Sequence, residues 1–384
     1  MHYKGHKLWV KRSNQSVLES GSNSGAFGDP SLLRALGGSK EVLEVSMRAW
    51  RMETLKSILQ EWVEDDHRKR NGQLVVWKAM KEQYDPSYDW TELGSKSIRD
   101  FDSVILKEGQ KEEVLKDLRL FLSQKEWFQK TAVPYQRGYL LYGPPGTGKT
   151  SFIQSLAGKV GMNVALVSLT AGIDDDSFMN LIHNKPRNSI LVMEDIDHCM
   201  INDGLGSDGE GSTKRITATG LLNALDGVFS PEGSIVFLTC NDVTKVIPAL
   251  LRPGRVDLKV LLDYADKYQV KHMFKRFFGE VDFDSNRGEK LSAREVCKKK
   301  VFDKLMDEIP EGTVTPAELQ NLFMSYAIQL QMTKQDSDDE IAEEKKIFEA
   351  LSDAIPEFLS KVAADRQQAR DHEKRKADKQ TNKK

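Results

Sequence analysis

One eight-residue segment organises this chain, and it reads Gly143-Pro144-Pro145-Gly146-Thr147-Gly148-Lys149-Thr150. It matches the pattern Gly-x-x-x-x-Gly-Lys-Ser/Thr, in which a glycine-rich loop presents backbone N–H groups to phosphate oxygens. In this pattern the lysine reaches the β and γ phosphates, and the final hydroxyl is placed for Mg²⁺. The alternative is a chance Gly-Pro turn before a surface helix.

The residues on either side of the loop favour nucleotide binding. A short apolar run over 137–142 precedes it, as in a buried strand, and apolar residues over 150–160 follow at helical spacing. The helix N-terminus would then point its dipole at the phosphates. The predicted nucleotide-binding residues are Gly143, Pro144, Pro145, Gly146, Thr147, Gly148, Lys149, Thr150 and Ser151.

Composition excludes several classes of protein. With 384 residues, 39% hydrophobic and 30% charged, the chain is typical of a soluble globular protein with two or three cores. Lys plus Arg (56) nearly balance Asp plus Glu (58), so the chain has no large excess of positive charge that would attract nucleic acid. Nucleic acid is therefore not expected as a partner. Three widely spaced cysteines indicate free thiols in a reducing compartment. No apolar run approaches the roughly 20 residues that span a bilayer.

The first hundred residues differ from the rest of the chain. Alternating patterns predict strands over 7–11, 43–47 and 74–79 and a helix over 52–63, while 13–40 is rich in Ser, Gly and Asn and is predicted to be mostly loop. A polar, turn-rich run up to Lys96 closes this region. We predict a small α+β domain over 1–100.

Helices and strands then alternate over 101–264. After a short extended run at 102–106 and a helix at 111–122, the patterns predict strands over 137–142, 164–169, 189–193, 234–240 and 256–262, with helices over 174–183 and 216–229. Continuous apolar strands alternating with helices predict an α/β fold with a five-stranded parallel sheet covered on both faces. Ligands of such sheets bind beyond the carboxyl ends of the strands.

Three further predicted helices, over 266–278, 295–309 and 316–331, make a small helical domain over 265–331. The remainder, 332–384, is predicted to be a charged helical tail that solvent surrounds, and the Gly-rich run at 202–214 is predicted to be a mobile loop.

Two predicted strands end in chemically useful side chains. Glu194 and Asp195 end one of them, where a Mg²⁺ held by Thr150 and phosphates would sit; the alternative is an ordinary acidic loop. Asn241 ends another strand, and its amide can bind the γ-phosphate or the attacking water, or simply begin a turn. Further on, Arg252 and Arg255 flank a Pro-Gly turn, and guanidinium groups suit phosphate recognition.

This order of motifs resembles the AAA family of ring ATPases. More closely, the segments 137–146, 220–227 and 251–257 resemble the Bcs-type members, and the resemblance extends over most of residues 43–330. Those proteins are mitochondrial inner-membrane chaperones that insert the Rieske iron–sulfur subunit into respiratory complex III. The resemblance implies MgATP hydrolysis, a protein substrate, a homo-oligomeric ring that is heptameric, and a location at the mitochondrial inner membrane.

The resemblance also implies roles for individual residues. Glu194 joins Thr150 at the metal, Asp195 activates water, and the catalytic set is Asp195, Asn241, Arg252 and Arg255. The arginines would face the γ-phosphate of the neighbouring subunit. The helical domain at 265–331 corresponds to the AAA lid.

Three features depart from what AAA proteins usually show. Glu194-Asp195 reverses the usual order of the acidic pair, as the Bcs-type subfamily also does. The transmembrane helix that Bcs-type proteins carry near the amino end is missing from this sequence, and a truncated sequence, a spliced form and a soluble paralogue are the alternatives. Membrane association is expected only if a further amino-terminal segment exists. The loop at 170–176 has no aromatic residue to grip an extended chain, so a folded substrate is expected. An alternative function is a nucleotide-gated protein-binding scaffold that hydrolyses slowly; a DNA-remodelling role is disfavoured by the charge balance.

Overall fold

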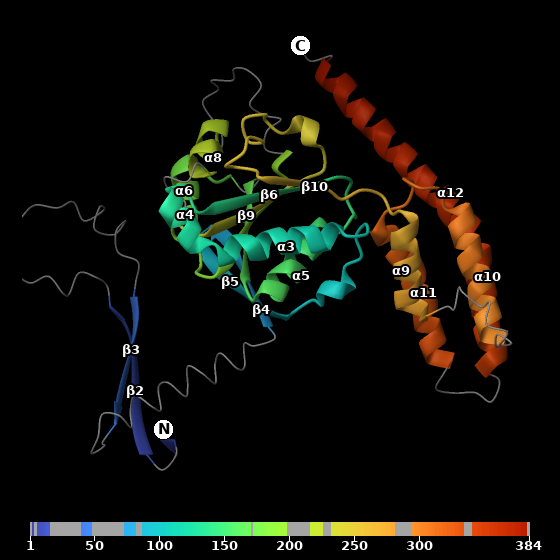
Figure 1. Ribbon diagram of the computed structural model, residues 1–384, viewed down its shortest axis with the longest axis horizontal. Coiled ribbons are helices and arrows are strands. Elements are labelled where there is room, and N and C mark those ends of the chain that lie inside the picture. Colours follow the sequence, from blue (N-terminus) through green and yellow to red (C-terminus); the bar gives the residue numbers. More distant parts are fainter. Residues whose placement is uncertain are drawn as a thin grey trace, which may run out of the picture. The chain divides into compact units, whose positions relative to one another are not determined.

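The computed structural model describes residues 2–3, 6–15, 40–47, 73–81, 87–169, 172–197, 216–225, 232–280, 293–333 and 340–381 (Figure 1). The chain divides into two compact units, Met1–Asn71 and Gly72–Lys384. The predicted helix at 52–63 and the predicted loop at 202–214 lie outside the described residues, as does most of the predicted loop at 13–40.

The first unit contains an antiparallel sheet in the order β1-β2-β3. Its strands are β1 (His2–Tyr3), β2 (His6–Gln15) and β3 (Lys40–Met47). Leu8 pairs with Met47, and the register continues without a break to Gln15 and Lys40. The strands predicted at 7–11 and 43–47 are therefore confirmed, and both are longer than predicted.

The second unit is built on a seven-stranded sheet in the order β10-β6-β9-β8-β7-β4-β5. Neighbouring strands are parallel from β10 to β4, and only β5 is antiparallel to its neighbour. The five predicted parallel strands are all present, as β6 (Gln136–Tyr142), β7 (Asn163–Ser168), β8 (Ser189–Glu194), β9 (Ser234–Cys240) and β10 (Leu258–Leu261).

The sheet has two strands that the sequence analysis assigned elsewhere. The strand predicted at 74–79 is β4 (Gln73–Lys81), but it pairs with β7 of the large sheet and not with a small amino-terminal domain. The polar run predicted to be turn-rich is β5 (Tyr88–Ser97), an edge strand. Its exposed polar side chains suit an edge, and the indole Nε1 of Trp90 donates to the carbonyl oxygen of Leu181 at 2.9 Å. The sequence pattern near β4 and β5 did not indicate these pairings, because β4 pairs with β7, a strand distant in the sequence.

Alternation along the buried strands separates two hydrophobic faces. On one face, strand residues such as Tyr139 and Leu141 pack with α3 (Gln110–Ser123) and α5 (Lys149–Val160). On the other, Leu140 packs with α6 (Asp175–His183) and α8 (Ala218–Leu225). Figure 1 shows α3 and α5 lying together over the first face. A parallel sheet needs this double cover because its central strands are apolar on both sides.

A connecting segment leads into α3. We expected residues 102–106 to be extended, but Phe101–Ser103 forms the short 3-10 helix η2. The Asp100 side chain caps it by accepting a hydrogen bond from the Asp102 N–H at 3.2 Å, and Phe101 is buried against the core. A cap and a buried aromatic anchor therefore favoured a turn of helix here. A short helix, α4 (Lys125–Thr131), follows α3, and η4 (Val243–Lys245) follows β9.

The three predicted lid helices are present in the described part of the chain, and a further helix, α12 (Glu340–Thr381), packs against them. The three predicted helices are α9 (Lys267–Phe278), α10 (Ala293–Glu308) and α11 (Pro316–Thr333). The sequence analysis assigned α12 to a solvated tail, but Phe348, Leu351 and Ile355 are buried in the core of the lid. Within the described part of the chain, no helix is both long and apolar enough to cross a membrane.

Candidate nucleotide-binding and hydrolysis site

The phosphate loop connects β6 to α5 and needs glycine where it bends. Gly143 follows β6 with a φ of 135°, and a Cβ at this position would lie 2.0 Å from the backbone oxygen of Leu262. Gly148 is the N-cap residue of α5 and has a φ of 94°. A side chain is excluded at the first position by space and at the second by backbone conformation.

The first turn of α5 offers backbone donors to an anion. The first hydrogen bond of the helix joins the N–H of Phe152 to the carbonyl oxygen of Gly148 at 2.8 Å. The N–H groups of Lys149, Thr150 and Ser151 therefore have no partner inside the helix. Together with the helix dipole, these donors favour phosphate oxygens.

Lys149 is nearly buried and holds the loop together. Its ammonium donates to the carbonyl oxygens of Gly143 at 2.7 Å and Pro144 at 3.0 Å, and to Oδ1 of Asn241 at 2.8 Å. Burial lowers the pKa of this lysine, while the carboxylate of Asp195 acts in the opposite direction. A bound phosphate would add negative charge and so favour the charged form of the lysine.

Thr150 and Glu194 come together from α5 and β8. The Thr150 hydroxyl donates to Oε1 of Glu194 at 2.6 Å. Hydroxyl and carboxylate oxygens are the ligands that Mg²⁺ prefers. The hydroxyl can keep this hydrogen bond while its lone pair faces a cation, so these two residues fit a magnesium ion held with the help of phosphate oxygens and water.

Asp195 follows β8 in a left-handed conformation, with a φ of 52°. Such a backbone conformation is uncommon for a residue with a side chain and is often found at functional sites. The Asp195 N–H donates to the Thr239 hydroxyl at 3.1 Å, and Oδ1 of Asp195 accepts from Nδ2 of Asn241 at 3.3 Å. Because the Asp195 side chain is exposed, its carboxylate can meet water. Lys149, Asn241 and Asp195 thus form a continuous chain of hydrogen bonds.

Asp197 belongs to this site, although the sequence analysis gave it no role. It is buried, and its Oδ2 accepts from the backbone N–H groups of Asn241 and Asp242, both at 3.2 Å. Among the residues that the structure describes, its Oδ1 has no hydrogen-bond partner. The carboxylate therefore fixes the backbone that carries the Asn241 side chain. The only signal for it in the sequence was its position two residues after Asp195.

Two cavities meet at the phosphate loop. One, of about 280 Å³, is lined by the loop, Asp195 and Asn241. The other, of about 670 Å³, lies between the loop, the segment that precedes α3, and lid helices α9 and α11. Gly146, Gly148 and Ser151 line both cavities. Together these cavities offer a polar end for phosphates and a larger end for the rest of a nucleotide.

Arg252 and Arg255 line neither of these two cavities. Arg252 is exposed, whereas Arg255 is half-buried and its Nη1 donates to the carbonyl oxygen of Ala249 at 2.7 Å. The other predicted catalytic residues, Asp195 and Asn241, do lie at the phosphate loop. The structure therefore separates the two arginines from the remainder of the predicted site of the same chain.

Two contacts near the loop were missed by the sequence analysis. The N–H of Ala317, in the first turn of α11, donates to the carbonyl oxygen of Gly146 at 3.1 Å, which ties the lid to the loop. Nη1 of Arg99 donates to the Ser151 hydroxyl at 3.1 Å. The Thr315-Pro316 helix start was a signal for the first contact, but no local pattern marks Arg99.

Three family models match the chain. Residues 139–264 match the ATPase family associated with various cellular activities (AAA). Residues 1–104 match the BCS1 N-terminal domain, and residues 267–332 match the ATPase lid domain of mitochondrial chaperone BCS1-like proteins. The matches cover the two regions of the site described above, the sheet with its phosphate loop and the lid.

Individual relatives agree with these matches. Mitochondrial chaperone BCS1 of Bos taurus is 35% identical over 277 residues, which is 70% of this chain and 61% of the relative. Probable mitochondrial chaperone BCS1-B of Dictyostelium discoideum is 30% identical over 354 residues, or 85% of this chain and 69% of the relative. The chain thus spans about three fifths to two thirds of these relatives. From the three family models and these relatives, the chain belongs to the BCS1 family of AAA ATPases.

Proposed function

We propose that this chain binds MgATP and hydrolyses it as one subunit of a homo-oligomeric ring. The observation that carries the proposal is the hydrogen-bonded chain from Lys149 through Asn241 to Asp195 at the phosphate loop. It joins a cation suited to phosphate, an amide suited to the γ-phosphate or water, and a carboxylate suited to activating water. The proposed nucleotide-binding residues are the nine from Gly143 to Ser151.

Each side chain has a proposed task. Lys149 turns its ammonium from the loop carbonyls to the β and γ phosphates. Asn241 orients the attacking water or the γ-phosphate, and the exposed carboxylate of Asp195 accepts the proton of that water. Thr150 and Glu194 hold Mg²⁺, which when bound neutralises charge on the β and γ oxygens.

Arg252 and Arg255 are proposed to act on the nucleotide of the neighbouring subunit. Their absence from the cavities of their own phosphate loop supports this proposal. An arginine supplied in trans stabilises charge that develops during phosphoryl transfer. One chain alone would therefore be an incomplete catalyst, and ring assembly would control turnover.

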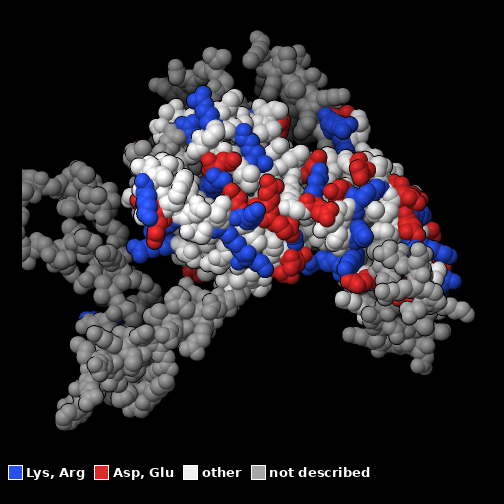
Figure 2. Space-filling model, viewed as in Figure 1, with Lys and Arg blue, Asp and Glu red and all other residues white. Residues whose placement is uncertain are grey.

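The work done by hydrolysis is proposed to be chaperoning or translocation of a protein substrate, of the kind used in assembling respiratory complexes. The relatives are named as mitochondrial chaperones, which supports chaperoning and a mitochondrial location. The inner membrane is the part of the mitochondrion that we propose. Nucleic acid is a less suitable partner. On the face drawn in Figure 2, basic and acidic side chains are interspersed and no broad area is basic alone.

Two variants test the site. Lys149→Ala removes the charge that holds the phosphates, so ATP should bind at least about tenfold more weakly. Asp195→Asn keeps the side chain's size, so MgATP should bind nearly as in the wild type while turnover falls by about 10²- to 10⁴-fold. Asp176→Asn, at an exposed position on α6, is the matched control and should change neither quantity.

The measurements are ATP affinity by calorimetry and phosphate release at saturating MgATP. Equal loss of ATP binding in Lys149→Ala and Asp195→Asn would show that Asp195 binds nucleotide and does not activate water. If the wild type binds MgATP tightly but shows no turnover even with a bound protein substrate, the chain is a nucleotide-gated scaffold instead.

A further inference from the structure

Arg99 holds an unusual position at the edge of the nucleotide cavity. Its Nε donates to the Ser103 hydroxyl and its Nη1 to the Ser151 hydroxyl, both at 3.1 Å. A guanidinium group has five N–H donors in a planar fork. Within the described residues these two bonds leave three donors, and Arg99 lines the cavity of about 670 Å³. The positively charged guanidinium group of Arg99 therefore lines the cavity between the core and the lid and can donate further hydrogen bonds there.

Ser151, which Arg99 contacts, lies at one end of the row of backbone donors formed by Lys149, Thr150 and Ser151. Ser151 carries the last backbone N–H in the first turn of α5 that has no partner inside the helix, and it lines both cavities. Lys149 marks the other end, where it meets Asn241. Because the lysine of such loops reaches the β and γ phosphates and the loop N–H groups hold the α and β phosphates, the Ser151 end is where the α-phosphate belongs.

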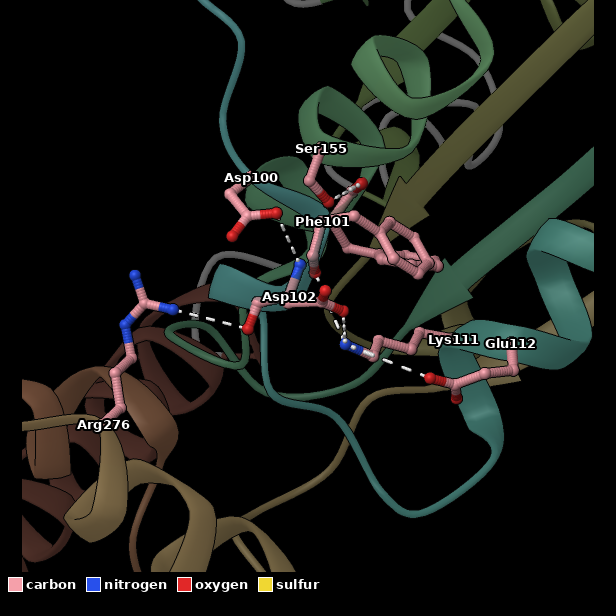
Figure 3. Close-up of polar contacts among 8 residues, drawn as sticks. Asp100, Phe101, Asp102, Lys111, Glu112, Ser155 and Arg276 are labelled. Atoms are coloured by element: carbon pink, nitrogen blue, oxygen red, sulfur yellow. Dashed lines mark hydrogen bonds and ion pairs between the residues drawn. The ribbon is translucent and has the colours of Figure 1, made fainter. Parts of the chain in front are cut away.

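The segment that carries Arg99 is anchored on several sides. Figure 3 shows Asp102 between Lys111 of α3 and Arg276 of lid helix α9. The Lys111 ammonium lies 3.1 Å from Oδ1 of Asp102, and Arg276 Nη1 donates to the Asp102 carbonyl oxygen at 3.4 Å. Phe101 is buried in the core. These contacts place Arg99 beside the loop before any nucleotide arrives.

Arg276 also lines the cavity but is less suited to the same task. Its Nη1 donates to the backbone oxygen of Asp102 at 3.4 Å, so one of its N–H groups is already used in holding the connecting segment. Arg99, by contrast, donates directly to Ser151 of helix α5, which follows the phosphate loop.

We propose that Arg99 binds the α-phosphate of the nucleotide, and so contributes equally to the affinity for ATP and for ADP. This inference rests on the proposed function, because it needs a nucleotide at the loop. The connecting segment before α3, which lies outside the phosphate-loop motif, would then take a direct part in binding the nucleotide. The competing explanation is that Arg99 only ties this segment to α5 through Ser103 and Ser151.

Four variants separate these explanations. Arg99→Ala removes the donor group, and Arg99→Lys keeps the charge without the planar fork. Arg119→Ala makes the same chemical change at an exposed position on α3 and is the matched control. Lys149→Ala reports on the β and γ phosphates. For each purified full-length protein, the dissociation constants of ATP and ADP are measured by calorimetry, and the melting temperature is measured without nucleotide.

Arg99→Ala should weaken ATP and ADP by the same factor, about tenfold, as expected for losing a charge-assisted hydrogen bond. Arg99→Lys should restore part of the affinity, and the melting temperature without nucleotide should stay that of the wild type. Lys149→Ala should weaken ATP more than ADP, and Arg119→Ala should change nothing.

Three results would overturn the inference. These are unchanged affinities in Arg99→Ala, a loss confined to ATP, or a lower melting temperature without nucleotide that Arg99→Lys does not restore. Failure of the proposed function gives a different result, because the wild type itself would then bind neither nucleotide and Lys149→Ala would have no effect.

Discussion

Replacing Asp197 with alanine tests how the site is positioned. The carboxylate is 2% exposed, and one oxygen accepts the backbone N–H groups of Asn241 and Asp242 at 3.2 Å each. In Asp197→Ala both N–H groups lose their acceptor inside the protein. We therefore expect a stability loss together with displacement of the Asn241 side chain.

The magnitude follows from these contacts. Hydrogen bonds to a charged group contribute about 1.5–3 kcal/mol, and the long distances favour the lower value, which makes about 3 kcal/mol for the pair. Oδ1 is buried without a hydrogen-bond partner among the described residues, so its removal stabilises the fold by about 1 kcal/mol. The unit from Gly72 to Lys384 unfolds with an entropy of about 2.1 cal/mol/K per residue, so a net loss of about 2 kcal/mol lowers its melting temperature by roughly 3 °C.

The assay compares Asp197→Ala with Asp197→Asn, whose amide oxygen still accepts both N–H groups. The melting temperature of Asp197→Asn should fall by less than half of the decrease seen in Asp197→Ala. Turnover at saturating MgATP should fall about 10- to 100-fold in Asp197→Ala, because small displacements of catalytic groups have effects of this size, while ATP affinity changes little. Asp176→Ala on the surface of α6 is the control. If Asp197→Asn is as damaging as Asp197→Ala, or if neither lowers the melting temperature, the two N–H contacts do not hold the site and the reasoning is wrong.

Three other predictions concern the ring, a buried lysine and the substrate. The double variant Arg252→Ala/Arg255→Ala should bind ATP but not turn it over, and mixing it with Lys149→Ala should restore part of the activity; no recovery in rings shown to contain both chains would mean that the arginines act within their own subunit. Burial lowers the pKa of Lys185 to about 8, compared with about 10.4 in an unfolded chain. Burying the charged ammonium therefore destabilises the folded state. This loss of stability is complete below pH 8 and disappears as the pH rises through 10. Lys185→Met should therefore be more stable than the wild type by about 2 kcal/mol at pH 7, after about 1 kcal/mol is subtracted for the lost hydrogen bond to Ser189. This advantage should vanish in melting curves recorded near pH 10. A tightly folded reporter bound to the ring should keep its structure during ATP hydrolysis, as followed by hydrogen exchange, and ATP-driven unfolding of the reporter would contradict transport of a folded substrate.

Local signals in the sequence were sufficient for the phosphate loop and for the five parallel strands. The loop is defined by residue type at fixed spacing, since only glycine fits at Gly143 and Gly148. The strands from β6 to β10 are short apolar runs bounded by helices, and β6, β8 and β9 are buried along most of their length. The acidic and amide ends of β8 and β9 were predictable for the same reason, because parallel strands bring their carboxyl ends to one edge of the sheet.

Tertiary structure alone decided which distant segments meet. β4 belongs to the large sheet because it pairs with β7, which lies about ninety residues further along the chain. The sequence did not predict this pairing, because contacts between such distant segments leave no periodic pattern. Phe348, Leu351 and Ile355 give α12 an apolar face, but only the packed lid shows that this face is buried against other helices and not solvated. Arg99 meets Ser151 through the folded connecting segment. The sequence by itself therefore determined the chemistry at the loop, whereas non-local packing decided which residues stand around it.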